Sequence, residues 1–458
     1  MSGPTERLAT YAGGLRYEDL PAAVVARTKD LVLDTLGTLL GGSRYPAGRL
    51  VTEYTEGLGE SGPCTVAGSA LRVSPVAAAF ANATMSHCLE QDDNYNPANA
   101  HIANVVLPAA LSIGEARRAS GQELIAALVA AYDVEGRVGI ALDPVRLYAR
   151  SFHPSSIGGN FGAAAAAGRM LRLEPDQMVD AFGLAGCQAS GLLAWVTESS
   201  QLSKAFQIGV ASRNGVTAAQ LAEIGFPGPP HILEGKHNLF RAFSGIPDGR
   251  IPVLTDGLGE RFELMRTSLK KYAACRQIHA PLDGLFAIMG RHRVRADDIA
   301  AIETAVATSM AGIIDNNELP SHNAQYVLAV AAYDGKVGVD QLDGRRLGDP
   351  RIAALSRRVR VFGSDELEKR FPEQWSGVTT VKTNDGREFT ETVYYPTGDP
   401  ENAMSAADLR AKFRTLSAGV VSDLRLDEIE RLVAELDTLG DCGVLARCLY
   451  EGHFERSR

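Results

Sequence analysis

The stretch SFHPSSIGGNFGAAAAAGRM, residues 151–170, places one histidine ahead of a run made almost entirely of glycine and alanine. Small side chains do not hold neighbouring helices apart, so Gly158 to Gly168 is predicted to form a helix that other helices approach almost to backbone contact. His153 and Ser155 stand where this helix would begin, with its amide groups pointing outward, which suits a small anionic ligand. Acidic and basic residues elsewhere could converge on this point, namely Asp92, Asp93, His101, Lys204 and His279.

The length and composition indicate a globular protein of two or three domains. The chain has 458 residues, of which 45% are hydrophobic and 22% are charged, an ordinary balance that does not require long disorder. The formal net charge of -9 argues against nucleic acid or an anionic membrane as the main partner. Met1–Leu20 has no signal-peptide pattern, and no apolar run reaches the length of about 18 residues that a membrane helix needs. We therefore expect a soluble, cytoplasmic protein.

The cysteines indicate reduced thiols. There are six of them, scattered and without a CxxC pair, which argues against a disulfide framework or a zinc site. Cys275 and His279 would lie one helical turn apart, as in a Cys–His nucleophile pair or half of a metal site. No further ligands lie near them in the sequence, so we predict no metal ion. The glycine-rich run lacks GxGxxG spacing and a preceding strand, so a dinucleotide site is not expected either.

Helical patterns dominate the chain to about residue 265. Apolar positions recur at helical spacing from Pro21 to Gly42, and capping signals occur at Ser120–Glu123 and Glu174–Gln177. The pattern then changes to segments rich in valine and threonine, which predict strands at residues 301–310, 357–362 and 377–395, with a hairpin turn at Asn384-Asp-Gly386. From Ser405 the pattern is helical again.

The predicted fold is therefore mainly α, a large all-helical domain with a smaller α+β lid domain. We place the first part of the helical domain at residues 1–265 and the lid at residues 266–400. Residues 401–458 form a helical return that packs on the first domain.

Several long segments, in the same order along the chain, resemble the MmgE/PrpD family. They are SHCLEQDDNYNPANAHIANVVLPAAL, FHPSSIGGNFGAAAAAGRMLRLEPDQMVDAFGLAGCQASGL, SKAFQIGVASRNGVTAAQLAEIGFPGPPHILEG, LKKYAACRQIHAPLDGL and PTGDPENAMSAADLRAKF. Members of this family include 2-methylcitrate dehydratase, cis-aconitate decarboxylase and iminodisuccinate epimerase. The resemblance implies chemistry at a carbon next to a carboxylate of a small polycarboxylate. It also implies a helical domain with an α+β lid, a homodimer, and no required metal or organic cofactor.

The resemblance carries catalytic roles to particular residues. His153 matches the family's FHP(T/S) element, Lys204 its lysine after a polar turn, and His279 the histidine that opens the lid. The other catalytic candidates are His101 before the LPAA segment, Asp93 in the acidic run, and Tyr326 as a pocket tyrosine. We assign substrate binding to Glu90, Asp92, Asn94, Ser155 and Arg276. Removing a proton next to a carboxylate needs a base and cations that hold the developing charge, and these residue types supply both.

Other readings of the same residues remain open. Asp92 and Asp93 could cap the following helix, and Lys204 could be a solvated lysine, although the apolar run after it favours an anchor for a substrate carboxylate. The remaining histidines are interpreted mainly as surface or packed residues, namely His231, His237, His292, His322 and His453.

The acidic loop departs from the family pattern. Related dehydratases and decarboxylases usually have an acidic-aromatic-acidic-acidic-threonine run, whereas this chain reads Glu90-Gln-Asp-Asp-Asn94, with one extra residue before His101. We predict an enzyme that abstracts a proton next to a carboxylate of a small di- or tricarboxylate, with Asp93, His101 or His153 as base. A lyase is the first reading, either a dehydratase or a decarboxylase. The alternatives are an epimerase and a catalytically inactive carboxylate-binding protein.

Overall fold

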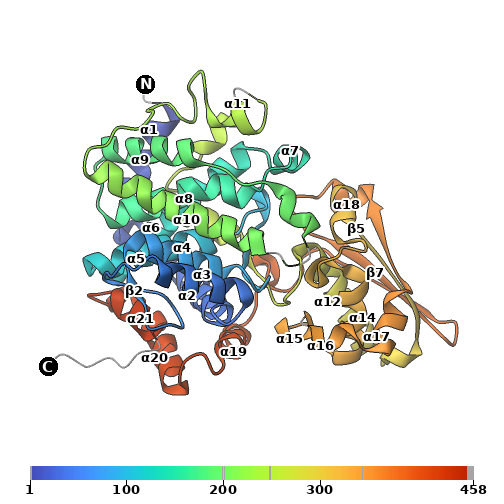
Figure 1. Ribbon diagram of the computed structural model, residues 1–458. Helices are drawn as coiled ribbons and strands as arrows, with labels where there is room; N and C mark the ends of the chain where they lie inside the picture. The colour runs from blue at the N-terminus through green and yellow to red at the C-terminus, as the bar shows by residue number, and fades with distance from the viewer. Residues whose placement is uncertain (1–2, 199, 201, 247–248, 343, 451–458) are drawn as a thin grey trace.

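The protein is a mainly helical molecule with a smaller mixed part at one side. The computed structural model describes residues 3–450 except 199, 201, 247, 248 and 343. Figure 1 shows the two parts side by side, with the helical part carrying both chain ends and the mixed part formed by the orange segments. This agrees with the predicted fold class. No helix in the described part of the chain is both long enough and apolar enough to cross a membrane.

The glycine-alanine stretch forms α8 (Pro154–Met170), which is buried along almost its whole length. Neighbouring helices approach it closely: a Cβ on Gly215 would lie 2.3 Å from the Cβ of Ala163, so the approach requires glycine. The predicted helix over residues 21–42 is confirmed, as are both capping signals. The other helices of this part are α1 (Pro4–Gly14), α2 (Ala22–Gly42), α3 (Pro46–Gly57), α4 (Pro75–Ser86), α5 (Ala103–Arg117), α6 (Gly121–Ala141), α7 (Pro144–Ala149), α9 (Pro175–Gln188), α10 (Leu202–Glu223) and α11 (Leu239–Phe243).

The last three helices return to the first part. They are α19 (Ala406–Ser417), α20 (Asp423–Ala434) and α21 (Gly443–Cys448), drawn in red against the blue helices in Figure 1. Their apolar residues, among them Phe413 and Leu445, belong to the same hydrophobic core as Leu36 and Ile125. The strands β1 (Cys64–Thr65) and β2 (Arg72–Val73) form a small separate pair.

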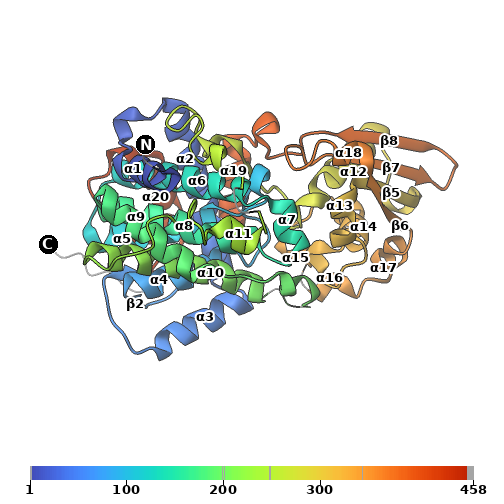
Figure 2. The same ribbon diagram turned by 90° about the horizontal axis from the view of Figure 1, so that it is seen from above.

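The mixed part is built on a four-stranded sheet in the order β6-β5-β7-β8. Strand β5 (Ile299–Ala307) is parallel to β6 (Val359–Ser364) and antiparallel to β7 (Gly377–Thr383), and a hairpin joins β7 to β8 (Glu388–Val393). Figure 2 shows the helices of this part gathered on one side of the sheet. They are α12 (His279–His292), α13 (Thr308–Ile314), α14 (Ala324–Asp334), α15 (Val339–Leu342), α16 (Gly344–Leu347), α17 (Pro350–Ser356) and α18 (Asp365–Glu368).

The predicted strands are found, with shifted ends. The hairpin turn is confirmed, and Gly386 adopts a φ of 86° there. The predicted strand over residues 301–310 ends at Ala307 because Thr308 begins α13. Glu368 accepts the backbone N–H of Ser309 at 2.8 Å, which stabilises the start of that helix.

Two short strands connect the helical part to the beginning of the mixed part. Strand β3 (Asp93–Tyr95) pairs antiparallel with β4 (Thr267–Leu269), with Asp93 opposite Leu269. The core of the helical part includes Leu269, and that of the mixed part begins at Tyr272. The residues that follow β4 therefore lie at the seam between the two cores, beside the acidic run.

Candidate active site

A cavity at this seam gathers charged and aromatic side chains from both parts. The space between protein atoms at this site is about 410 Å³ with open solvent included, and the centre of a water molecule can reach about 30 Å³ of it. Among the predicted site residues, Glu90, Asn94, His101, Lys204 and Arg276 line it. The other lining residues are Asn99, Tyr148, Trp195, Val196, Lys270, Cys275, Gln277, Ile313, His322 and Trp375.

The pairing of β3 with β4 places a buried lysine against the acidic run. The backbone N–H of Lys270 donates to the Asp92 carbonyl at 3.3 Å, and its Nζ lies 3.0 Å from Asp92 Oδ1 and 3.3 Å from Glu90 Oε2. Lys204, from the first turn of α10, contacts the other oxygen of Glu90. These four side chains are almost completely buried, so an unpaired charge among them would be costly.

The two lysines keep both carboxylates ionised. Burial alone would raise the pKa of Glu90, but Lys204 and Lys270 hold it well below its usual value. Burial opposes ionisation of Asp92 as well, and Lys270 and His101 nevertheless hold its pKa well below the usual value. Burial would lower the pKa of Lys270, whereas Asp92 and Glu90 raise it. At neutral pH Glu90 is therefore an acceptor that positions two ammonium groups at the cavity.

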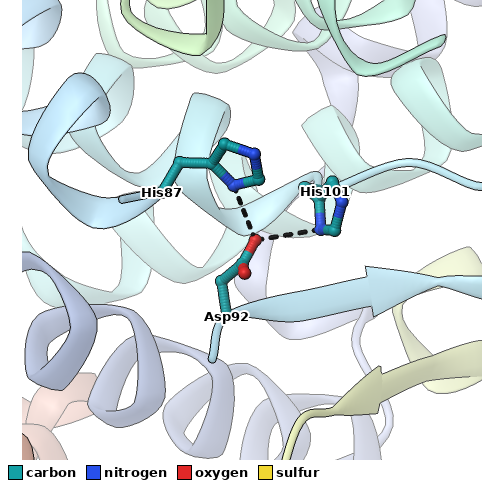
Figure 3. Close-up of side chains that lie close together, drawn as sticks. All are labelled: His87, Asp92 and His101. Atoms are coloured by element: carbon teal, nitrogen blue, oxygen red, sulfur yellow. Dashed lines mark hydrogen bonds and ion pairs between the residues drawn. The ribbon is translucent and has the colours of Figure 1, made fainter. Parts of the chain in front are cut away.

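Asp92 also orients two histidines. Figure 3 shows the rings of His87 and His101 turned towards the same Asp92 oxygen, with each Nδ1 2.9 Å from it. The Nδ1 of His101 also lies 2.7 Å from the Asp93 carbonyl oxygen, which can only accept a hydrogen bond. His101 therefore carries its hydrogen on Nδ1, and when neutral it has a free lone pair on Nε2. No hydrogen bond in the described part of the chain engages that Nε2, and the ring lines the cavity.

The cluster of His87, Asp92 and His101 has the residue types of a metal site, and its ligand atoms lie within 4.8 Å of one another. Its surroundings oppose a cation. The ammonium of Lys270 lies 3.0 Å from Asp92, and the side-chain amide of Asn104 also donates to this carboxylate. Burial lowers the pKa of His87 to about 4, so this ring is neutral, and its Nδ1 is already engaged by Asp92. We interpret the cluster as a hydrogen-bonded support for His101.

Arg276 offers unused donors to the cavity. It lies in the 3-10 turn Arg276–Ile278, and its Nη2 is bonded to Asp399. Its Nε and Nη1 are buried and have no hydrogen-bond partner among the described residues. Buried donors are nearly always satisfied in a complete site, so Arg276 keeps donor capacity for a ligand carboxylate; Nε and Nη1 point apart, so each would bond a different acceptor.

Two predicted proton-transfer residues lie behind the cavity wall. The carboxylate of Asp93 accepts from the Tyr132 hydroxyl at 2.8 Å and the Ala103 N–H at 3.1 Å, and burial raises its pKa to about 7. The Nδ1 of His153 lies 3.0 Å from the Ser156 hydroxyl, and its ring packs 5.4 Å from that of Trp195. Burial, with a smaller effect of the Lys204 charge, lowers the pKa of His153 well below its usual value.

The remaining predicted residues contribute indirectly or lie elsewhere. The Ser155 hydroxyl accepts the backbone N–H of His101 at 3.0 Å, so it holds the cavity wall in place. His279 is buried beside Tyr272, with its Nε2 3.2 Å from the Ala274 carbonyl oxygen. Tyr326 donates its hydroxyl hydrogen to the Gln341 carbonyl within the mixed part. None of these side chains lines the cavity, and their assigned roles remain predictions.

Sequence reasoning missed several residues of the cavity. His322 was expected to be a surface or packed residue, but it lines the cavity, and burial lowers its pKa to about 3. His231, His237 and His292 are exposed as expected, and His453 lies outside the described residues. Lys270 stands in the family-like segment LKKYAACRQIHAPLDGL, so its position next to that motif was an available signal. Both tryptophans of the chain, Trp195 and Trp375, line this cavity as well, and no local sequence signal pointed to them.

Comparisons with known proteins agree with the predicted resemblance. Residues 6–251 match the model of the MmgE/PrpD N-terminal domain, and residues 272–438 match that of the MmgE/PrpD C-terminal domain. A cis-aconitate decarboxylase of Aspergillus terreus is 29% identical, covering 98% of this chain and 96% of that protein. The human cis-aconitate decarboxylase is 25% identical over 97% of this chain and 94% of its own length. A 2-methylcitrate dehydratase of Cupriavidus necator is 26% identical over 87% of each chain. Decarboxylases and dehydratases are lyases, in agreement with the predicted reaction class.

Proposed function

Because this chain belongs to the MmgE/PrpD family, we propose that it is a lyase acting next to a carboxylate of a small tricarboxylate. Decarboxylation of cis-aconitate is the first candidate reaction, since decarboxylases of this substrate align with nearly the whole chain. The observation that carries the proposal is the cavity itself, in which three cationic side chains and His101 meet at the seam.

The cations are suited to a substrate with several carboxylates. Lys204, Lys270 and Arg276 reach the cavity from α10, from the end of β4 and from the turn before α12. Glu90 is the carboxylate among the lining residues, and it contacts both lysines. A bound tricarboxylate would gain charge-assisted hydrogen bonds from these groups in a buried setting, where such bonds are strongest.

His101 is the proton-transfer group in this proposal. In decarboxylation the bond from carbon to a carboxylate breaks, carbon dioxide leaves, and the electron pair stays with the carbon skeleton. One proton then adds at this carbon or, after the double bond shifts, at its far end. A protonated His101 can supply that proton from Nε2, while Asp92 orients the ring and stabilises the imidazolium.

Dehydration is the second candidate, and the tautomer of His101 favours it specifically. A neutral ring with its hydrogen on Nδ1 presents Nε2 as a base. That base can take a proton from the carbon next to a carboxylate. The electron pair then forms a double bond as the neighbouring hydroxyl leaves with a proton as water. A relative named 2-methylcitrate dehydratase aligns over most of this chain.

Turnover by the purified protein tests the proposal. We would incubate it with cis-aconitate, 2-methylcitrate and iminodisuccinate in deuterium oxide and follow carbon dioxide, alkene absorbance and deuterium uptake. His101→Gln is expected to lower kcat about 100-fold or more with a smaller effect on KM. His292→Gln is the matched control, because His292 is an exposed histidine of the lid that packs on Phe389.

The results distinguish the decarboxylase, the dehydratase, the epimerase and the carboxylate-binding protein from one another. Carbon dioxide release from cis-aconitate supports the decarboxylase, and a change in alkene absorbance with 2-methylcitrate supports the dehydratase. Inversion of iminodisuccinate with deuterium uptake and no alkene would establish the epimerase instead. Absence of any reaction and of any exchange would contradict the enzyme proposal and favour the carboxylate-binding alternative.

We also propose that the enzyme is a homodimer, as the family resemblance implies. Leu50 and Tyr54 on α3 and Phe206 on α10 are each at least half exposed, at 55%, 56% and 50%, and Phe80 packs between the two aromatic rings. Contiguous exposed apolar side chains of this kind mark protein interfaces. Tyr54→Glu should shift the mass measured by light scattering towards the monomer, whereas Leu424→Glu should not. A monomeric wild type would refute the proposal.

We also retain the predicted cytoplasmic location, with which six free thiols are consistent.

A further inference from the structure

Trp195 lines the cavity, and its indole N–H has no acceptor among the residues that the structure describes. The side chain lies in the 3-10 turn Leu193–Thr197 and is only 3% exposed. Its Nε1 is fully buried and has no hydrogen-bond partner among the described residues. The other tryptophan of the cavity, Trp375, donates its Nε1 hydrogen to the Pro372 carbonyl at 2.9 Å. The two indoles thus share one cavity but differ in whether the protein satisfies them.

The surroundings of Trp195 hold its ring in place. The Nζ of Lys204 lies 4.7 Å from the centre of the indole, within the range of a cation–π contact. The ring of His153 packs at 5.4 Å and that of His322 at 6.0 Å, both edge to face. Side chains from the helical part and from the mixed part therefore fix the indole where the two meet.

From these observations we infer that Trp195 is a substrate-binding residue whose Nε1–H donates to a carboxylate of the bound tricarboxylate. A buried indole N–H normally finds an acceptor, and leaving it unpaired costs free energy. The described residues supply none here, and the indole is part of the cavity lining. An anionic ligand in that space provides the missing acceptor.

Lys204 places a positive charge beside the indole of Trp195. Its ammonium group lies over the indole ring, so one carboxylate could accept from both Lys204 and Trp195. An unused donor of Arg276 would hold another carboxylate. Two separate anchors, each combining charge with directed donors, would select a substrate that has at least two carboxylates at a set spacing.

This inference rests on the proposed function, and the indole resonances test it directly. The chain has two tryptophans, so ¹⁵N-tryptophan labelling yields two indole N–H signals, which Trp375→Phe assigns. We would add citrate, a tricarboxylate without the double bond, and measure its binding by calorimetry in parallel. The expected result is that the Trp195 N–H signal moves downfield as citrate binds, because a hydrogen bond to a carboxylate deshields this proton.

Kinetics supply a second measurement. Trp195→Phe keeps an aromatic ring against Lys204 and His153 but removes the N–H, so KM for the turned-over substrate should rise about 10- to 100-fold with a smaller change in kcat. Tyr333→Phe is the matched control, since it also removes one donor from an aromatic ring but lies in the mixed part outside the cavity lining.

The outcomes distinguish a failure of the Trp195 assignment from a failure of the proposed function. Citrate binding without movement of the Trp195 signal would overturn the role of Trp195 and leave the proposed function intact. An unchanged KM in a folded Trp195→Phe variant would overturn it as well. Failure of every tricarboxylate to bind or react would refute the proposed function and this inference with it. Either Trp375→Phe or Trp195→Phe assigns the two signals, so the titration of the unmodified protein can be interpreted when one of these variants folds.

Discussion

Replacing Lys270 by methionine should destabilise the protein severely, because it leaves two buried carboxylates without their shared cation. The Nζ of Lys270 lies 3.0 Å from Asp92 and 3.3 Å from Glu90. At an effective dielectric constant of about 20, each attraction is about 5 kcal/mol before desolvation is subtracted. Removing one partner from a buried ionic cluster typically costs about 3–5 kcal/mol. We therefore expect Lys270→Met to lower the free energy of unfolding by about that amount at pH 7.

The stability loss caused by Lys270→Met should change with pH in a predictable direction. Lys270 holds the pKa of Asp92 and contributes to holding that of Glu90 well below the usual values, despite burial. Stability from such a depression is complete above the unfolded pKa of about 4 and is lost as pH falls through the folded pKa. The raised pKa of Lys270 adds stability below its unfolded pKa of about 10.4, which is lost at higher pH. The difference between wild type and variant should therefore be largest at pH 5–9 and shrink below about pH 4.

Urea unfolding followed by circular dichroism at pH 7.5 and at about pH 3 measures this difference. Lys271→Met is the control, because Lys271 is the exposed neighbour of Lys270 and should cost less than about 1 kcal/mol. Adding Asp92→Asn to Lys270→Met should recover part of the loss, since Asp92 then carries no charge and Glu90 keeps Lys204 as its partner. A Lys270→Met variant that is as stable as the control, or whose deficit grows as pH falls, would refute the reasoning.

Asp93→Asn should raise stability by about 2–4 kcal/mol at pH 8 and by less at pH 5. Burial raises the Asp93 pKa to about 7, so folding disfavours the charged carboxylate, and this cost grows as pH rises from about 4 to about 7. Unfolding midpoints at both pH values check this, and an equal gain at both would contradict it. Gly215→Ala should lower the free energy of unfolding by about 3 kcal/mol, because its Cβ would lie 2.3 Å from that of Ala163, whereas Gly312→Ala has open space and should be neutral or stabilising. Lys204→Ala should raise KM about 10- to 100-fold by removing a charge-assisted bond, and an unchanged KM would remove Lys204 from the site. Exhaustive chelation should leave turnover unchanged, because the cations beside the His–Asp cluster oppose a metal; loss of activity restored by one divalent ion would reverse that interpretation.

The sequence alone was sufficient for the features that depend on neighbouring residues. Capping residues, apolar spacing and the turn at Asn384-Asp-Gly386 act within a few positions of the chain, so they predicted helices and a hairpin that the structure contains. The glycine and alanine of α8 predicted close helix packing for the same reason, since side-chain size is a local property. Family resemblance added the order of the two parts and the class of chemistry.

The composition of the site required the tertiary structure. Lys270 reaches Asp92 across 178 residues of chain through the pairing of β3 with β4, and strands of three residues carry too little pattern to predict their partner. His322 and Trp195 have no local signature that separates a cavity residue from a packed one. Conversely, Asp93 is adjacent to Asp92 in sequence, yet its carboxylate points to Tyr132 behind the wall, because successive side chains near a strand face opposite sides. Residue types and their local elements are therefore properties of the sequence, whereas the choice of which side chains face the cavity was made by strand pairing and helix packing over long distances.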